Sequence, residues 1–218
     1  MDQKHPTSEG YTREAASLQW YLRLTRNLTM TALPHNASNS TPTVSDVQTD
    51  HWIDPLKDGT HVLIRPLEAK DREREFAFIK NLSPESRHFR FLCSITEPGN
   101  ALMNQLMAVN SPQQMAYVAL FMDGGHLIEI GVARYASAEG DTQCESAVVV
   151  ADQWQNKGLG KRLMQHLIDA ARLNGFESMM SMDSAVNTHM RGLAQELGFD
   201  SHRDPLDATQ VVYRLALN

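Results

Sequence analysis

A chain of 218 residues with 42% hydrophobic content can bury one sizeable domain with an appendage, and it is short for a second full domain. Its net charge of −6 argues against a nucleic-acid-binding protein, which would need a concentrated basic surface to neutralise phosphates. The sequence has no apolar run of roughly 20 residues and no basic stretch followed by an apolar export segment. We therefore expect a cytoplasmic protein that does not bind a membrane or a nucleic acid.

The cysteines and histidines give no sign of a metal site. Cys93 and Cys144 have neither metal-ligand spacing nor the density of a disulfide scaffold, which fits a reducing compartment. The nine histidines include no pair at the His-x-x-x-His spacing that places two ligands on one helical face. We expect no metal cofactor.

The N-terminal region divides into an arm and a linker. Apolar residues between positions 12 and 30 recur at helical spacing, which predicts a helical arm within residues 1–30. Residues 31–52 are rich in Ser, Thr, Asn, Pro and Asp, which is typical of a flexible linker. The arm is interpreted as a packing element for the domain or for a second copy in a homodimer. A membrane-surface helix is the alternative, which Glu14 and modest basicity weaken.

A folded domain is predicted over residues 53–218, beginning with a strand and then helices. Val62 to Pro66 reads as a strand ended by proline, and helices are expected at 69–81, from the cap pair Ser83-Pro84, and at 101–108. Two strands at 115–122 and 127–135 follow, separated by the hairpin signal Asp123-Gly124-Gly125-His126. Residues 146–150 complete a three-stranded meander, and their all-apolar run 147–150 is typical of a strand covered on both faces.

From residue 159 onward the apolar residues recur at the spacing of an α-helix. Leu159, Leu163 and Leu167 mark a helix that ends before Gly175, and a strand at 176–182 follows it. A second helix covers 190–197 and stops at Gly198, and the chain closes with an alternating strand at 210–217. This order predicts an α+β or mixed α/β fold, in which helices cover a sheet.

The turn Gln155-Asn156-Lys157-Gly158-Leu159-Gly160 lies between a strand and a helix, where glycines let the backbone approach a phosphate closely. A Walker A loop is excluded because Arg162 follows Gly160-Lys161 and Gln155 stands at the position of the first glycine. A Rossmann turn fits poorly because Leu163 stands where the third glycine is required. A purely structural tight turn is the remaining alternative.

The motifs in order, from Ala147–Val150 through Gln155-x-x-Gly158-x-Gly160 to Asn187 and Leu197-Gly198-Phe199, resemble the GNAT N-acyltransferase superfamily. The resemblance covers roughly residues 58–217 and implies a mostly antiparallel mixed sheet with a splayed strand pair. It also implies that acetyl-CoA is the acyl donor, with its pyrophosphate at the glycine turn and its pantetheine arm along the preceding strand. The implied cofactor-binding residues are Val148, Val149, Val150, Gln155, Lys157, Gly158, Leu159, Gly160, Lys161 and Asn187.

Further segments, including Leu82-Ser83-Pro84-Glu85-Ser86-Arg87 and Glu145 to Val150, resemble the domain of bacterial Pat-type protein lysine acetyltransferases. Glu145 coincides with the glutamate that serves as general base in that domain, and Glu129 on the neighbouring strand is the second candidate. A base is needed because an amine of pKa near 10.4 is almost fully protonated at neutral pH. The resemblance also assigns the Val148 N–H as donor to the tetrahedral intermediate.

One departure concerns the general acid. Ala194 stands where many GNAT enzymes have a tyrosine, so water, Ser184 or His189 would protonate the leaving thiolate. The sequence thus predicts an N-acetyltransferase that acts on a primary amine, either a protein lysine or a small molecule. A non-catalytic acyl-CoA sensor is the alternative, and it would not need Glu145. A structural interaction module built on the N-terminal arm is a third interpretation.

Overall fold

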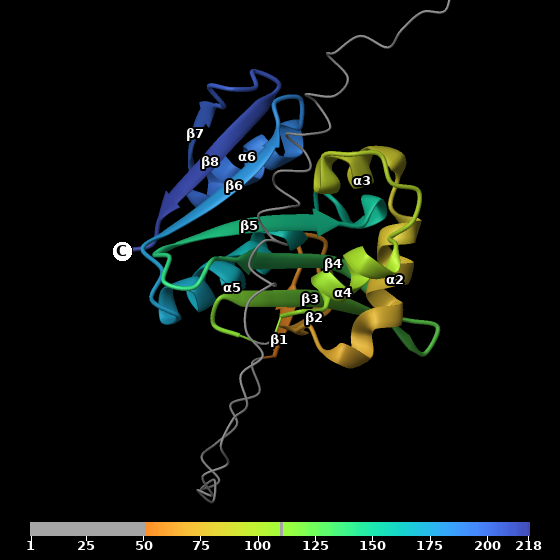
Figure 1. The fold of residues 1–218 in the computed structure, drawn as a ribbon. Helices are drawn as coiled ribbons and strands as arrows, with labels where there is room; N and C mark the ends of the chain where they lie inside the picture. The colour runs from red at the N-terminus through yellow and green to blue at the C-terminus, as the bar shows by residue number, and fades with distance from the viewer. Residues whose placement is uncertain (1–50, 110) are drawn as a thin grey trace, which may run out of the picture.

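The computed structural model describes residues 51–109 and 111–218, and their strands form one eight-stranded sheet in the order β1-β2-β3-β4-β5-β6-β8-β7 (Figure 1). The predicted arm at 1–30 and the linker up to residue 50 lie outside the described residues. All neighbouring strands are antiparallel except β5 and β6, which are parallel. The mixed, mostly antiparallel sheet expected from the sequence is confirmed.

Consecutive antiparallel strands build the first half of the sheet. They are β1 (Trp52–Pro55), β2 (His61–Pro66), β3 (Gln114–Asp123), β4 (His126–Ala136) and β5 (Gln143–Val150). Gly124 and Gly125 both have positive φ between β3 and β4, which is the backbone that a tight hairpin turn requires. The predicted hairpin is therefore correct, and β5 begins three residues earlier than expected.

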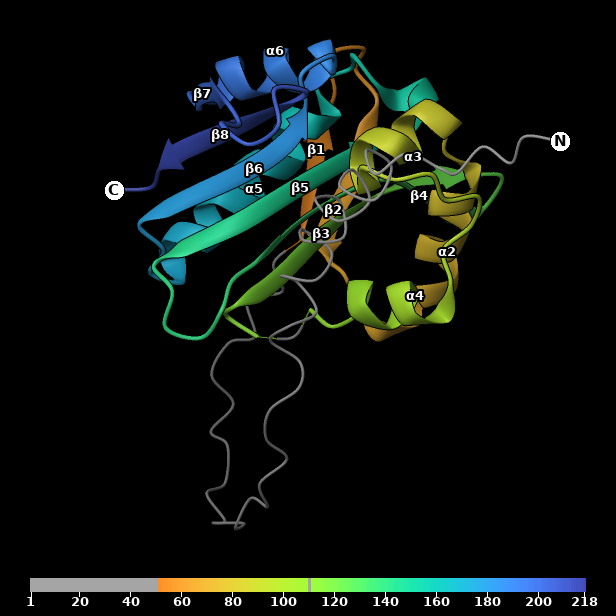
Figure 2. The same cartoon turned by 45° about the horizontal axis from the view of Figure 1, so that its top comes forward.

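Short helices connect β2 to β3. They are η1 (Ala69–Asp71), α2 (Arg72–Asn81), α3 (Pro84–Phe91) and α4 (Asn100–Leu106). Helices α2, α3 and α4 lie together on one side of the sheet (Figure 2). Helix α3 starts where the sequence predicts, because the Ser83 hydroxyl accepts a hydrogen bond from the Ser86 N–H at 3.1 Å and Pro84 occupies the first turn.

The second half alternates helices and strands. It comprises η2 (Asp152–Trp154), α5 (Leu159–Leu173), β6 (Ser178–Ser184), α6 (Thr188–Leu197), β7 (Asp200–Arg203) and β8 (Gln210–Ala216). Leu159, Leu163 and Leu167 of α5 are buried, as their spacing predicts. A Cβ on Gly131 of β4 would lie 3.1 Å from Leu163 Cδ1, so this glycine lets α5 approach the sheet closely.

Two strands were not predicted from the sequence. Strand β7 has four residues that are all exposed, so it carries no apolar alternation. Strand β1 is equally short, and side chains from α5 hold it in place. The Trp52 ring stacks on the His166 imidazole at 3.9 Å between centroids, and Asp54 Oδ2 lies 2.8 Å from His166 Nε2. Such contacts between distant segments leave no local pattern in the sequence.

Strands β5 and β6 pair only at Gln143, Cys144 and Glu145, opposite Ser178, Met179 and Met180. Beyond Glu145 the two strands separate, while β5 remains paired with β4 as far as Val150. Val148 and Val150 are consequently half-buried. Of residues 147–150 only Val149 is buried, so the expectation of a strand that is fully covered on both faces was wrong. This end of β5 is still paired with β4 but no longer with β6.

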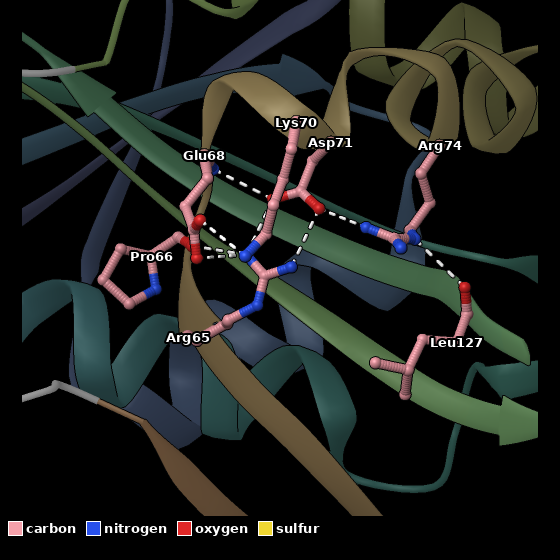
Figure 3. Close-up of polar contacts among 7 residues, drawn as sticks. All are labelled: Arg65, Pro66, Glu68, Lys70, Asp71, Arg74 and Leu127. Carbon is pink, nitrogen blue, oxygen red and sulfur yellow. Dashed lines mark hydrogen bonds and ion pairs between the residues drawn. The ribbon is translucent and has the colours of Figure 1, made fainter.

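A buried charge network fixes the corner between β2 and α2 (Figure 3). The Asp71 carboxylate is fully buried and accepts hydrogen bonds from both terminal nitrogens of Arg65 at 2.7 and 2.8 Å. It also accepts from the Glu68 N–H at 2.9 Å and pairs with Arg74, whose Nε donates to the Leu127 carbonyl of β4 at 3.0 Å. The network thereby ties η1 and α2 to two strands.

We predict that Asp71→Ala lowers the free energy of unfolding by about 3 kcal/mol, because it removes the buried carboxylate that pairs with the partly buried Arg65 and Arg74 cations. Burial opposes ionisation of Asp71, but the Arg65 and Glu68 hydrogen bonds outweigh it and hold its pKa below the ordinary value. The stabilisation should therefore be present at neutral pH and disappear as the pH falls below about 4. Urea denaturation of the wild type and the variant, at neutral pH and below about pH 4, measures this difference in the free energy of unfolding.

The control is Asp169→Ala. Asp169 pairs with Arg172 at 3.1 Å on the surface of α5, where both side chains are exposed, and its loss should cost less than about 0.5 kcal/mol. Equal effects of the two substitutions would contradict a structural role for the Asp71 network.

Candidate active site

A cavity of about 450 Å³ opens where β5 and β6 separate. It lies between the end of β5, helix α3, the start of α5 and helix α6. This volume is within the usual range of small-molecule sites. The predicted cofactor-binding residues that line it are Val148, Val149, Val150, Gln155, Gly158, Leu159, Gly160, Lys161 and Asn187. We call it the donor cavity.

The glycine turn forms one end of the donor cavity. Gly158 precedes α5 with φ of 88°, and no side chain caps the first turn of this helix. A Cβ on Gly160 would lie 3.4 Å from Leu193 and 3.7 Å from Val150, at ordinary van der Waals contact, so the turn packs between α6 and β5. The uncapped N–H groups and the positive end of a 15-residue helix suit a phosphate group. Lys161 adds a cation, which pairs with Glu196 at 3.3 Å.

The turn between β1 and β2 braces the glycine turn from outside. The Lys57 N–H donates to the Lys157 carbonyl at 3.0 Å, and Lys157 Nζ lies 3.0 Å from Asp58 Oδ2. Lys157 Nζ also lies 4.8 Å from the centroid of the Trp154 ring. Lys157 is held by these contacts and does not line the donor cavity. Lys57 does line the cavity, although from the sequence we predicted only a turn at this position.

Helix α3 is attached to the same region through Asp152. Its carboxylate accepts from the Ser83 N–H at 2.9 Å, the Ser83 hydroxyl at 2.6 Å and the Ser86 hydroxyl at 2.7 Å. Burial opposes ionisation of Asp152, but these hydrogen bonds outweigh it and lower its pKa. The Gln155 amide completes the connection by donating to Ser86 Oγ and to the Val150 carbonyl, both at 3.2 Å. The start of α3 and the glycine turn thus form one polar unit.

Asn187 and Asp183 line the side of the donor cavity opposite β5. Asn187 begins α6, where its side-chain oxygen accepts from the Met190 N–H at 3.1 Å. Its amide nitrogen lies 3.1 Å from each carboxylate oxygen of Asp183. Burial raises the pKa of Asp183 to about 6, although hydrogen bonds from Asn187 and Ser184 and the charge of Arg90 oppose this. Sequence reasoning did not single out Asp183, which is a carboxylate in a strand of low propensity.

A second, smaller cavity of about 50 Å³ lies between α3, α4 and strands β4 and β5, and Glu145 lines it. Most of its other walls are apolar, including Phe91, Leu102 and Leu106. Glu145 occupies the last position at which β5 pairs with β6, so it stands where the two strands begin to separate. The second cavity and the donor cavity therefore meet at the same part of β5.

Glu129, the second candidate for the base, lines neither cavity. It is buried on β4, and burial together with the neighbouring Glu75 carboxylate raises its pKa well above the ordinary value. Glu75 itself forms an ion pair of 2.6 Å with Arg134. Of the two candidate acids for the leaving thiolate, His189 lines the donor cavity and Ser184 does not. Ala194, which stands at the usual tyrosine position, is buried.

Neither a metal site nor a membrane-spanning helix is found in residues 51–109 and 111–218. These residues contain no group of three or more His, Cys, Asp or Glu side chains that could hold a metal ion. None of their helices is long and apolar enough to cross a membrane.

The parallel pair that separates, with a glycine turn leading into α5 beside it, defines the class as an acyl-CoA-dependent transferase. Residues 73–199 match the model of the acetyltransferase (GNAT) family, which places the chain in that family. Members of this family use acetyl-CoA and acetylate amine acceptors. The chain is 54% identical over 182 residues to Acetyltransferase PA5475 of Pseudomonas aeruginosa, covering 84% of this chain and 97% of that protein.

Other relatives are more distant. Acetyltransferase Pat of Mycolicibacterium smegmatis is 28% identical over 159 residues, which are 72% of this chain but 44% of that protein. The GNAT domain of S. lividans PAT superposes with a TM-score of 0.69 at 22% identity, covering 76% of this chain and 96% of that one. The structure of yncA from Salmonella typhimurium with acetyl-CoA gives a TM-score of 0.58 at 19% identity, covering 73% of this chain and 95% of that one. These two structures confirm the fold.

We predict that Gly158→Ala weakens acetyl-CoA binding at least tenfold, because the added methyl group strains a backbone with φ of 88° at the cavity wall. The same strain should lower the free energy of unfolding by about 1 kcal/mol. Gly175→Ala is a matched control, since Gly175 has φ of 82° with no atom near its Cβ position and lies at the far end of α5. It should cost the same stability and leave binding unchanged. Calorimetric titration that finds equal binding by both variants would contradict a role for the turn in holding the donor.

Proposed function

We propose that this acetyltransferase moves the acetyl group of acetyl-CoA directly to a primary amine, with Glu145 as general base. The observation that carries the proposal is the position of Glu145, on the wall of the second cavity and at the point where β5 leaves β6. A base at this point can serve an amine that enters from the second cavity while the thioester lies in the donor cavity. Because the two substrates then meet at β5, no covalent acyl-enzyme is required.

The donor is assigned by the shape and charge of the donor cavity. We place its pyrophosphate at the first turn of α5, where Gly158 and Gly160 leave the N–H groups accessible. We place its pantetheine arm along Val148 to Val150, since β5 has no strand partner on that side after Glu145 and its backbone can pair with an amide chain. This direction brings the thioester toward Glu145.

The reaction then follows from the residues near the thioester. Glu145 takes a proton from the ammonium, directly or through water, and the free amine attacks the thioester carbonyl. The Val148 N–H is the donor that we assign to the oxyanion of the tetrahedral intermediate. The nitrogen–carbon bond forms, the attacking nitrogen releases its second proton to water, the carbon–sulfur bond breaks, and the thiolate leaves as coenzyme A after it gains a proton. We assign that proton to water or to His189, which lines the donor cavity.

A protein lysine is the acceptor that we favour. The walls of the second cavity are mainly apolar, and Glu145 provides a carboxylate among them. A lysine side chain combines an aliphatic stem with a terminal ammonium and so matches both features. The resemblance of segments such as Glu145 to Val150 to the domain of Pat-type protein lysine acetyltransferases supports this choice. Small primary amines with an apolar stem are the second class of acceptor.

We predict that Glu145→Gln lowers kcat for acetyl transfer at least 100-fold, since a positioned general base contributes about 10² to 10⁴. The Kd for acetyl-CoA should stay within about twofold, because Glu145 lines the second cavity and not the donor cavity. Thiol release with lysine peptides and simple alkylamines measures transfer, and calorimetry measures binding. Glu139→Gln is the control, as Glu139 is exposed in the loop before β5 and lines neither cavity.

Transfer by Glu145→Gln at the wild-type rate would remove Glu145 as the base. If the wild-type protein acetylates alkylamines but no peptide lysine, small primary amines replace a protein lysine as the acceptor.

A further inference from the structure

Arg90 of α3 is the one residue in the described part of the chain that lines both the donor cavity and the second cavity. Its side chain is buried, with 7% of its surface exposed, although arginine is rarely buried to this extent. Its guanidinium carbon lies 4.9 Å from the centroid of the Phe91 ring, which belongs to the second cavity alone. Arg90 therefore occupies the junction between the two cavities.

The surroundings of Arg90 keep its charge at this junction. Burial lowers its pKa to about 9, as does the charge of Arg134, while the carboxylates of Glu75, Asp183 and Glu145 oppose this. The side chain is therefore cationic at neutral pH. These three carboxylates come from α2, β6 and β5, so negative charges on both sides of the separated strands favour the cationic form of Arg90.

We propose that Arg90 sets the length of the acyl group that the enzyme accepts by narrowing the junction through which a longer chain would pass. The inference rests on the proposed function, in which the thioester lies toward Glu145. An acetyl group ends near the junction, whereas each further methylene has to enter the space that Arg90 occupies. The exclusion has two causes, because a guanidinium is bulky and because it is a poor neighbour for an alkyl chain in a buried site.

The second cavity explains why such a partition is needed. Its walls are mainly apolar, so an alkyl chain that passed Arg90 would be stabilised there, by about fourfold in affinity for each methylene. The same space receives the amine in the proposed function. A butyryl group that extended into it would compete with the acceptor, whereas an acetyl group leaves it free.

The test measures the Kd of acetyl-CoA and of butyryl-CoA by calorimetry in the absence of an amine, so it does not depend on turnover. The wild-type protein should bind butyryl-CoA at least tenfold more weakly than acetyl-CoA. Arg90→Ala should reduce this preference by tenfold or more, since two methylenes gain roughly fifteenfold when the second cavity becomes accessible. Adding Ala147→Leu to Arg90→Ala should restore the preference, because Ala147 lines the second cavity and a leucine there would refill it.

The control is Leu102→Ala, which enlarges the second cavity from a wall that does not touch the donor cavity. It should leave the preference for acetyl-CoA as in the wild type. Arg90→Met, which keeps an unbranched side chain of similar length without the charge, serves if Arg90→Ala does not fold, and it should narrow the preference about threefold or more.

Equal binding of both thioesters by the wild-type protein would overturn the proposal without any variant. So would an unchanged preference in a folded Arg90→Ala or Arg90→Met protein. A changed preference in these variants, together with unaffected transfer by Glu145→Gln, would support Arg90 as the partition and reject Glu145 as the base. The two assignments can therefore fail separately.

Discussion

The brevity of the pairing between β5 and β6 is the constraint on which the rest of the site depends. Three residue pairs join these parallel strands before they separate. A buried strand normally has partners on both sides, because unpaired backbone groups are costly away from water. Here the unpaired edge of β5 is turned toward the donor cavity, where an extended amide chain could pair with it. Glu145 is the last paired residue, so the proposed base stands where the free edge of β5 begins.

Side chains from distant segments hold the separated strands open. Asp152 binds the start of α3 through Ser83 and Ser86, and Gln155 connects Ser86 to the Val150 carbonyl. These contacts attach α3 to the end of β5 at the place where β6 is absent. On the other side, Asn187 links the start of α6 to Asp183 of β6. The cavity is thus bounded by two polar attachments rather than by a continuous sheet, and the Asp71 network anchors the preceding helices.

The parts of the structure that were predictable from the sequence are those whose signal is local. Leu159, Leu163 and Leu167 recur at helical spacing, and Gly158 and Gly160 stand directly before or within the first turn, so α5 and its turn could be placed. Strand β1 could not, because its position depends on His166, more than 100 residues away. The role of Asp152 also escaped prediction, since its partners Ser83 and Ser86 are 69 and 66 residues distant. Glu145 and Glu129 are both strand carboxylates, and the resemblance alone placed Glu145 first. The cavities distinguish them by position, because Glu145 lines one and Glu129 lines neither.

Arg90 connects the chemistry that we propose for Glu145 with the stability of the fold. A buried cation costs more than an apolar side chain of similar size unless several groups satisfy it. Carboxylates on three elements supply this compensation, so the cost is spread over α2, β5 and β6. In the proposed function, the charge has a further effect on an amine that approaches Glu145. A neighbouring guanidinium disfavours the ammonium form and favours the neutral amine, which is the nucleophile. The same residue would then restrict the acyl group on one side of the junction and assist deprotonation on the other.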